Sequence, residues 1–208
     1  MIGQWIANIA LGYLLGAIPS GLVVGYAWLR KDIRQMGSGV TGTTNVLRTA
    51  GRIPAAIVMV ADISKGVIPA VVGRAVFKDD WVASAGACAA IVGHVWPVFA
   101  GFRGGRGVAT AFGGILGLSP LVALIFPVVG LALVVPTRYV SLMSVLGTPI
   151  SAAIIAGAAA AGWQPWAYAA YGGFAVLLIE YRHIPNIRRL LAGTEPKFGQ
   201  GGDRVATG

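Results

Sequence analysis

The sequence predicts an all-α integral membrane protein of about seven transmembrane helices, with its N-terminus outside and its C-terminus in the cytoplasm. Composition is the first reason: of 208 residues, 56% are hydrophobic and 11% are charged, and the mean hydropathy is +0.76. Too little polar surface is left to cover a water-soluble globule. The second reason is that basic residues cluster at the ends of apolar runs. The net charge of +9 therefore reflects topology, and we expect no nucleic-acid partner.

The expected helices follow from the apolar runs, since a spanning helix needs about 20 apolar residues. The runs cover residues 5–28, 54–77, 81–99, 110–118, 121–136, 142–161 and 166–181. Pro19 should kink the first run, and the fourth is short enough to be tilted or re-entrant. We expect residues 1–198 to form a single membrane-embedded domain and residues 199–208 to form a flexible tail. The only cysteine, Cys88, excludes an intrachain disulfide.

The charge distribution sets the orientation. Only Arg74 and Lys78 would lie outside, whereas the cytoplasmic side would hold Arg30, Lys31, Arg34, Arg48, Arg52, Arg103, Arg106, Arg138, Arg182, Arg188, Arg189, Lys197 and Arg204. This asymmetry follows the positive-inside rule. Trp5, Trp81, Trp163 and Trp166 would then belong to the outer aromatic belt.

Residues 36–45, with the sequence MGSGVTGTTN, form a glycine-rich loop between the first two runs. Glycines permit a positive φ, so backbone N–H groups can converge into an anion-binding nest, and two arginines follow the loop. The spacing also fits GxGxxG and the P-loop in part, but a membrane-length run replaces the required strand and threonines replace the Walker lysine. We predict a phosphate-binding loop; the alternative is a flexible turn without a ligand.

Two further polar segments should reach the same side. Residues 104–107, Gly-Gly-Arg-Gly, let the backbone approach a ligand while Arg106 offers a fork for phosphate. His94 before them is either a ligand or, more commonly, a hydrogen-bonded core histidine. Asp62 and Lys65 share a helix face, which fits either a self-neutralising structural pair or contact with substrate.

The last polar segment covers residues 180–197. After Pro185 it predicts a short basic amphipathic helix capped by Gly193, with His183 and Asn186 near its start. A stop-transfer anchor with a disordered tail would explain the basic residues but not Asn186 and Glu195.

Together these segments resemble the bacterial acyl-phosphate:glycerol-3-phosphate acyltransferases. The motifs in chain order are GSGxxGxTNxxRxxG from Gly37, DxxKG from Asp62, GHxxPxF from Gly93, GGxGVAT from Gly104, RYxS from Arg138 and HxxNIxRLLxGTE from His183. The resemblance implies a seven-helix inner-membrane enzyme with a cytoplasmic active site. It would transfer a fatty acyl group from acyl phosphate to glycerol 3-phosphate, giving lysophosphatidic acid and phosphate, without a metal or nucleotide cofactor. The partners would be these substrates, membrane lipids and, functionally, the enzyme that makes acyl phosphate.

On this basis we assign three groups of site residues. The catalytic group is Ser38, Arg48, His183 and Asn186. The acyl-phosphate-binding group is Gly37, Gly39, Gly42, Thr43, Thr44 and Asn45. The glycerol-3-phosphate-binding group is Arg52, Lys65, Arg106, Ser141 and Glu195.

The chain departs from the family pattern at four positions. Val40, Thr43, Arg106 and Ile184 stand where the family usually has Asn, Ala, Lys and Arg. Arg106 keeps the charge but replaces a point charge with a fork, so phosphate binding should survive with altered geometry. Neither histidine begins an HxxxxD dyad, because Phe99 and Arg188 stand at the required positions. A transporter or flippase for a phosphorylated solute is the main alternative function; a non-catalytic scaffold would not need three phosphate-suited loops.

Overall fold

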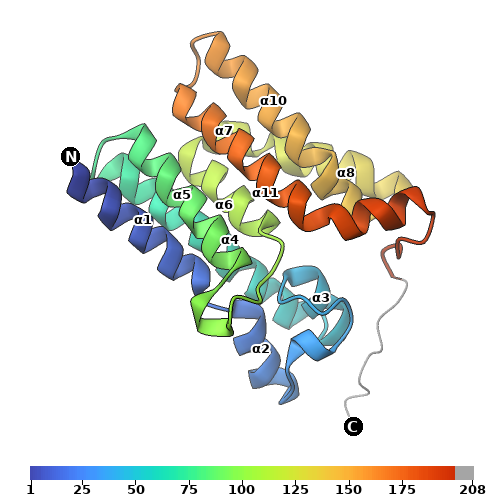
Figure 1. Cartoon of the computed structure of the whole chain (residues 1–208). Helices are drawn as coiled ribbons and strands as arrows, with labels where there is room; N and C mark the ends of the chain where they lie inside the picture. Colours follow the sequence, from blue (N-terminus) through green and yellow to red (C-terminus); the bar gives the residue numbers. More distant parts are fainter. Residues whose placement is uncertain (200–208) are drawn as a thin grey trace.

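The computed structural model describes residues 1–199, and this part of the chain contains only helices, turns and loops, which confirms the all-α prediction (Figure 1). The α-helices are α1 (Ile2–Ala17), α2 (Ser20–Leu29), α3 (Thr43–Thr49), α4 (Arg52–Ala75), α5 (Asp80–Val95), α6 (Val108–Leu118), α7 (Pro120–Ala123), α8 (Ile125–Thr137), α9 (Val140–Val145), α10 (Gly147–Ala160) and α11 (Trp166–Leu191). Two short 3-10 helices, η1 (Ile33–Gln35) and η2 (Val98–Ala100), lie in loops. Except for Gly199, the expected flexible tail lies outside the described residues.

Within the described range, five segments are long and apolar enough to span a membrane: Ile2–Leu29, Arg52–Ala75, Asp80–Ala100, Pro120–Thr137 and Val140–Ala160. Helix α6 is apolar but has only 11 residues. Seven crossings would require both α6 and α11 to cross as well, so the count of seven stays a prediction.

Three expected helices are divided. Helix α1 ends at Ala17 and α2 begins at Ser20, with Pro19 between them, as the predicted kink requires. The fifth and sixth runs were expected to be continuous, but α7 and α8 meet at Leu124 and α9 and α10 meet at Leu146. Both of these leucines keep right-handed helical dihedral angles. The regular helical hydrogen bonding is therefore interrupted there, but the chain does not reverse direction.

The predicted short helix after Pro185 is wrong. Helix α11 runs without a break from Trp166 to Leu191 and contains Pro185. The proline removes one hydrogen bond, to the carbonyl of Tyr181, but Tyr181 is exposed and the next turn is held by burial of Asn186. The expected cap is confirmed: Gly193 has a φ of +69° just after the helix.

Glycines let the long helices approach closely. Gly12 and Gly16 of α1 lie against the backbone of α5 at Gly86 and Ala90, where an added Cβ would overlap a carbonyl oxygen. Gly66 of α4 meets α6 in the same way. Close backbone packing of this kind replaces the hydrophobic driving force that helices lack inside a bilayer.

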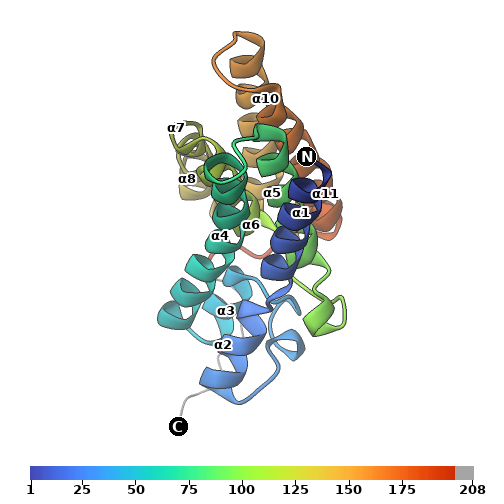
Figure 2. The ribbon, with the colours of Figure 1, turned by 90° about the vertical axis from the view of Figure 1, so that its left-hand side faces the viewer.

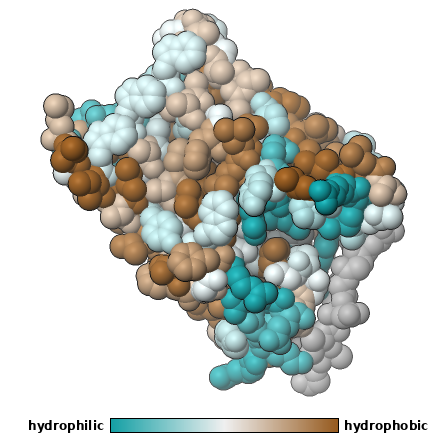
Figure 3. Space-filling view, in the orientation of Figure 1, coloured by the Kyte–Doolittle hydropathy of each residue, from teal (hydrophilic) through white to brown (hydrophobic). Residues whose placement is uncertain are grey.

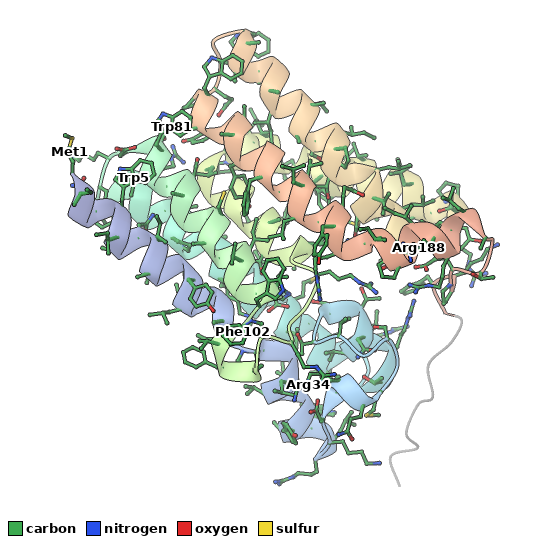
Figure 4. All side chains as sticks on the ribbon, viewed as in Figure 1. Met1, Trp5, Arg34, Trp81, Phe102 and Arg188 are labelled. Atoms are coloured by element: carbon green, nitrogen blue, oxygen red, sulfur yellow. The ribbon has the colours of Figure 1, made fainter. Side chains whose placement is uncertain are left out.

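Polar and apolar residues gather at different parts of the bundle. Figure 2 shows α2 and α3 at one end of the bundle, below α1 and α4. Hydrophilic residues cover this end and the end of α11, whereas the flanks are largely hydrophobic (Figure 3). Trp5 and Trp81 lie at the opposite end from Arg34 and Arg188 (Figure 4). The predicted phosphate-binding segments therefore meet at one polar end.

Candidate active site

The Gly37–Asn45 loop is organised by the side chain of Asn45. Its Oδ1 accepts a hydrogen bond from the backbone N–H of Ser38 at 2.8 Å. Its Nδ2 donates to the carbonyls of Ile33, Met36 and Val40 at 3.1, 3.1 and 2.9 Å. Asn45 is almost fully buried. Its side-chain amide therefore holds the loop together, and its assignment to acyl-phosphate binding stays a prediction.

The glycines of this loop have different roles. Gly37 and Gly39 take φ values of +55° and +72°, as predicted, and both are exposed beside Ser38. Gly42 has a φ of −80° and precedes the first turn of α3, so it does not use the positive φ that a glycine permits.

The rest of the segment is helical instead of loop. Thr43 and Thr44 form the first turn of α3, and Arg48 lies in its last turn. The hydroxyl of Thr43 is buried and has no hydrogen-bond partner in the described part of the chain. Arg52 begins α4 and is exposed, and among residues 1–199 it makes no side-chain hydrogen bond or ion pair. The assignment of Arg52 to glycerol 3-phosphate therefore stays a prediction.

Arg34 links the first polar loop to the second. Its Nη2 lies 2.7 Å from Asp32 Oδ2, and its Nη1 donates to the carbonyl of Ala100 at 3.1 Å. The hydrogen bond from Arg34 lowers the pKa of Asp32, so this carboxylate is charged at neutral pH. Figure 4 shows Arg34 and Phe102 in the same region of the polar end.

The Gly104–Gly107 loop uses its first two glycines to pack against protein, which differs from the expected close approach to a ligand. The N–H groups of Gly104 and Gly105 donate to the carbonyls of Val95 and His94 at 3.3 and 3.1 Å. A Cβ at Gly104 would overlap the His94 carbonyl, and one at Gly105 would overlap the His94 ring. The loop is thus seated on the end of α5, and Arg106 projects from a fixed backbone.

Arg106 lies in a cluster of cations. Burial lowers its pKa, and the nearby charges of Arg189, Arg182 and Arg48 lower it further, against the opposing effect of Glu195. Arginine nevertheless stays protonated at neutral pH. The guanidinium groups of Arg48, Arg106, Arg182 and Arg189 therefore outnumber the Glu195 carboxylate that opposes them, and such a region favours anions.

The end of α11 carries the remaining polar groups. Asn186 Nδ2 and Arg189 Nε each donate to one oxygen of Glu195, both at 2.7 Å. Burial raises the pKa of Glu195, but the hydrogen bonds from Asn186 and Arg189 outweigh this effect and hold the pKa below its usual range. Both carboxylate oxygens are used inside the protein, so Glu195 braces Asn186 instead of facing a substrate.

Several buried polar atoms near the end of α11 lack hydrogen-bond partners in the described part of the chain, among them Arg182 Nε. Within residues 1–199, the Oδ1 of Asn186 and the Oγ of Ser141 are buried and make no hydrogen bond of acceptable geometry. Buried polar atoms without partners are costly, and they mark positions that a ligand can satisfy. His183 is also buried, with its Nδ1 2.8 Å from the carbonyl of Ile179. Because a carbonyl only accepts, Nδ1 carries the proton and Nε2 is left with a free lone pair.

Lys65 does not join the arginine cluster. Its Nζ donates to Asp62 Oδ1 at 2.6 Å, and both side chains are buried in α4. Asp62 Oδ1 also lies 3.6 Å from His94 Nδ1. The structure therefore favours the self-neutralising pair, and the assignment of Lys65 to glycerol 3-phosphate stays a prediction.

Two residues of the cluster were not assigned to the site from the sequence. Arg182 and Arg189 were considered only as anchors of topology, although their spacing with Asn186 places all three on one face of a continuous helix. Pro185 concealed that pattern. In the described range, the structure contains no group of three or more His, Cys, Asp or Glu residues that could hold a metal ion.

Comparison with known proteins agrees with this arrangement. Residues 6–193 match the family model described as glycerol-3-phosphate acyltransferase. A glycerol-3-phosphate acyltransferase from Rubrobacter xylanophilus is 44% identical over 196 residues, covering 92% of this chain and 94% of the relative. One from Halalkalibacterium halodurans is 43% identical over 190 residues, covering 90% and 92%.

Two solved structures are also similar. The crystal structure of PlsY (YgiH), an integral membrane glycerol 3-phosphate acyltransferase, in its glycerol 3-phosphate form has a TM-score of 0.87 at 38% identity and covers 94% of this chain and 96% of that chain. The lysophosphatidic acid form has a TM-score of 0.84 at 37% identity, with 94% and 95% covered.

Proposed function

This chain belongs to the glycerol-3-phosphate acyltransferase family, and we propose that it transfers a fatty acyl group from acyl phosphate to the 1-hydroxyl of glycerol 3-phosphate. The products would be lysophosphatidic acid and phosphate. We further propose that residues 1–198 act as one unit in the inner membrane, with the N-terminus outside and the site on the cytoplasmic face. The charge asymmetry of the loops supports this orientation.

The observation that carries the proposal is the cationic cluster. Arg182 reaches the loop of Arg106 by donating to the Gly105 carbonyl, and the charges of Arg189, Arg182 and Arg48 lower the pKa of Arg106 whereas the charge of Glu195 raises it. An excess of guanidinium groups at the polar end of a membrane bundle suits two phosphate-bearing substrates. A thioester donor would not need a second phosphate site next to the reacting carbonyl.

The reaction makes modest chemical demands on the protein. Acyl phosphate is a mixed anhydride and is already activated, so catalysis consists of positioning and charge stabilisation. The acceptor hydroxyl oxygen bonds to the acyl carbon, and the bond between that carbon and the phosphate oxygen breaks. The acyl group moves to the acceptor, and phosphate leaves with the electron pair.

The chain offers groups for each part of this step. The N–H groups and Ser38 of the first loop, with Arg48, would bind the donor phosphate, and Arg106 would bind the phosphate of the acceptor. Asn186 Oδ1 would accept a hydrogen bond from the acceptor and orient it, while His183 Nε2 would take the proton of the attacking hydroxyl as the new bond forms and pass it to the departing phosphate. Asn45 and Glu195 would act indirectly, because their hydrogen bonds hold the first loop and the Asn186 amide.

The test is acyl transfer by the purified protein to labelled glycerol 3-phosphate, with palmitoyl phosphate, palmitoyl-CoA and palmitoyl acyl carrier protein as parallel donors. We expect labelled lysophosphatidic acid from palmitoyl phosphate alone. Transfer from the thioester donors at an equal rate would overturn the donor assignment. Uptake of labelled glycerol 3-phosphate into proteoliposomes, without transfer, would instead support a transporter.

A further inference from the structure

A buried ionic cluster lies behind the loop that carries Arg106. Asp62 and Lys65 of α4 form a direct ion pair, and His94 of α5 approaches the same carboxylate oxygen at 3.6 Å. All three side chains are at least 90% buried. Ionisable groups are expensive to bury in a membrane bundle and usually serve a purpose there. None of them belongs to the arginine cluster.

The other side of the His94 ring faces the second polar loop. If a Cβ is added to Gly105, its three nearest atoms all belong to this ring, and the closest is Nε2. The Gly105 N–H donates to the His94 carbonyl at 3.1 Å, and Arg182 Nη2 donates to the Gly105 carbonyl at 3.3 Å. The peptide that leads directly into Arg106 is thus held between the His94 ring and Arg182.

From this contact we infer that His94, oriented by Asp62 and Lys65, is a positioning residue that sets the backbone of Gly105 and so aims Arg106 at the acceptor phosphate. The inference rests on the proposed function of Arg106. Asp62 keeps the ring in place from one side, and Lys65 neutralises the carboxylate. The ring transmits that fixed position to the loop by direct contact.

The neighbouring glycine provides a matched control. Gly104 is also packed tightly, but an added Cβ would meet the backbone carbonyls of His94 and Val95 and the ring of Pro97. Removing the His94 side chain leaves the two carbonyls in place. Gly105 therefore depends on the His94 ring for its position, whereas Gly104 does not.

The experiment is a double-mutant cycle with His94→Ala and Gly105→Ala, read as KM for glycerol 3-phosphate and kcat with palmitoyl phosphate. Each single substitution should raise this KM about 10-fold and change kcat less than about 3-fold, because the acceptor site is displaced while the donor site is not. The double variant should have a KM close to that of Gly105→Ala alone, since residues in contact do not act additively. Asp62→Asn should raise KM in the same direction.

The control cycle replaces Gly105→Ala with Gly104→Ala, and here the effects of the two substitutions should multiply. Independent, multiplicative effects in the Gly105 cycle would overturn the inference, as would an unchanged KM in His94→Ala. If His94→Ala does not fold, as judged by thermal unfolding and gel filtration, His94→Asn takes its place, because it also removes the ring from Gly105.

A binding measurement separates this inference from the proposed function. The rise in Tm that glycerol 3-phosphate causes should be reduced in the same variants and show the same coupling. If the wild type transfers no acyl group but glycerol 3-phosphate still raises its Tm, the donor proposal fails. The role of His94 is then tested by comparing the ligand-induced rise in Tm among the single and double variants. If glycerol 3-phosphate neither reacts nor raises the Tm, both proposals are overturned.

Discussion

Asn186 Nδ2 donates a hydrogen bond to Glu195 Oε1 at 2.7 Å, and within residues 1–199 the other polar atom of the same amide, Oδ1, has no partner. The carboxylate fixes which side of the amide faces the site, because a carboxylate only accepts hydrogen bonds. An acceptor oxygen is thereby held in a fixed orientation on α11, the helix that also carries His183. The predictions below follow from this arrangement and from the loops around it.

Asn186→Ala should lower kcat on the order of 100-fold, because a group that orients the attacking hydroxyl is lost. Arg188→Ala is the matched control, since Arg188 lies on the same helix but is exposed, and it should retain near-normal turnover. The measurement is kcat at saturating palmitoyl phosphate and glycerol 3-phosphate. Similar losses in both variants would contradict a specific role for the Asn186 amide.

Glu195 should make stability depend on pH in acid. Its pKa in the folded protein is lower than the ordinary value of 4.5, so the unfolded chain takes up this proton first as pH falls. The stabilisation is complete above pH 4.5 and is lost as pH falls through the folded pKa. Glu195→Gln should therefore lower the Tm at pH 7, and the difference from wild type should shrink toward pH 3. A constant difference across this range would show that ionisation of Glu195 is not the cause.

Asn45→Asp should be nearly as damaging as Asn45→Ala, although it keeps the size of the side chain and the acceptor for the Ser38 N–H. The new carboxylate would face three backbone carbonyls that now accept hydrogen bonds from Nδ2. Each of the two substitutions should lower the free energy of unfolding on the order of 3 kcal/mol, since the three backbone carbonyls lose their hydrogen-bond donor. Thermal unfolding and the KM for palmitoyl phosphate report the two effects. Gln35→Ala, at an exposed position nearby, should change neither.

Arg48→Ala and Arg52→Ala should differ sharply, although the two arginines lie four residues apart. The charge of Arg48 affects the pKa of Arg106, whereas Arg52 is exposed and makes no side-chain hydrogen bond or ion pair among residues 1–199. We expect kcat/KM for palmitoyl phosphate to fall about 100-fold in Arg48→Ala, as for loss of a charged hydrogen bond, and less than about 3-fold in Arg52→Ala. Initial rates over a range of donor concentrations give both values. Equal losses of kcat/KM in the two variants would show that Arg52 also contributes to the site.

The helical class and the position of the polar end could be predicted from the sequence because they depend on composition and charge at the ends of apolar runs. The same information does not fix helix breaks at Leu124 and Leu146, which depend on how neighbouring helices pack. Pro185 predicts a helix boundary that the structure does not have. A single lost hydrogen bond near an exposed helix end is outweighed when the same turn buries Asn186.

The first and last motifs contain most residues of the candidate site, but the roles proposed for them depend on three-dimensional contacts. A sequence pattern could not show that Asn45 and Glu195 use their polar atoms inside the protein. Nor could it show that a side chain at position 104 or 105 would overlap His94, so that glycine is needed there for packing and not for binding a ligand. Arg182 and Arg189 could have been found from helical spacing, had the helix been continued through Pro185.

The most direct test of the account follows three quantities in one sample: palmitoyl phosphate consumed, inorganic phosphate released and lysophosphatidic acid formed. Direct transfer to the acceptor predicts equal amounts of all three at every time, and no phosphate release when glycerol 3-phosphate is omitted. Phosphate release without the acceptor, at a rate similar to that with it, would show that water attacks the donor and would contradict acyl transfer as the function of this site.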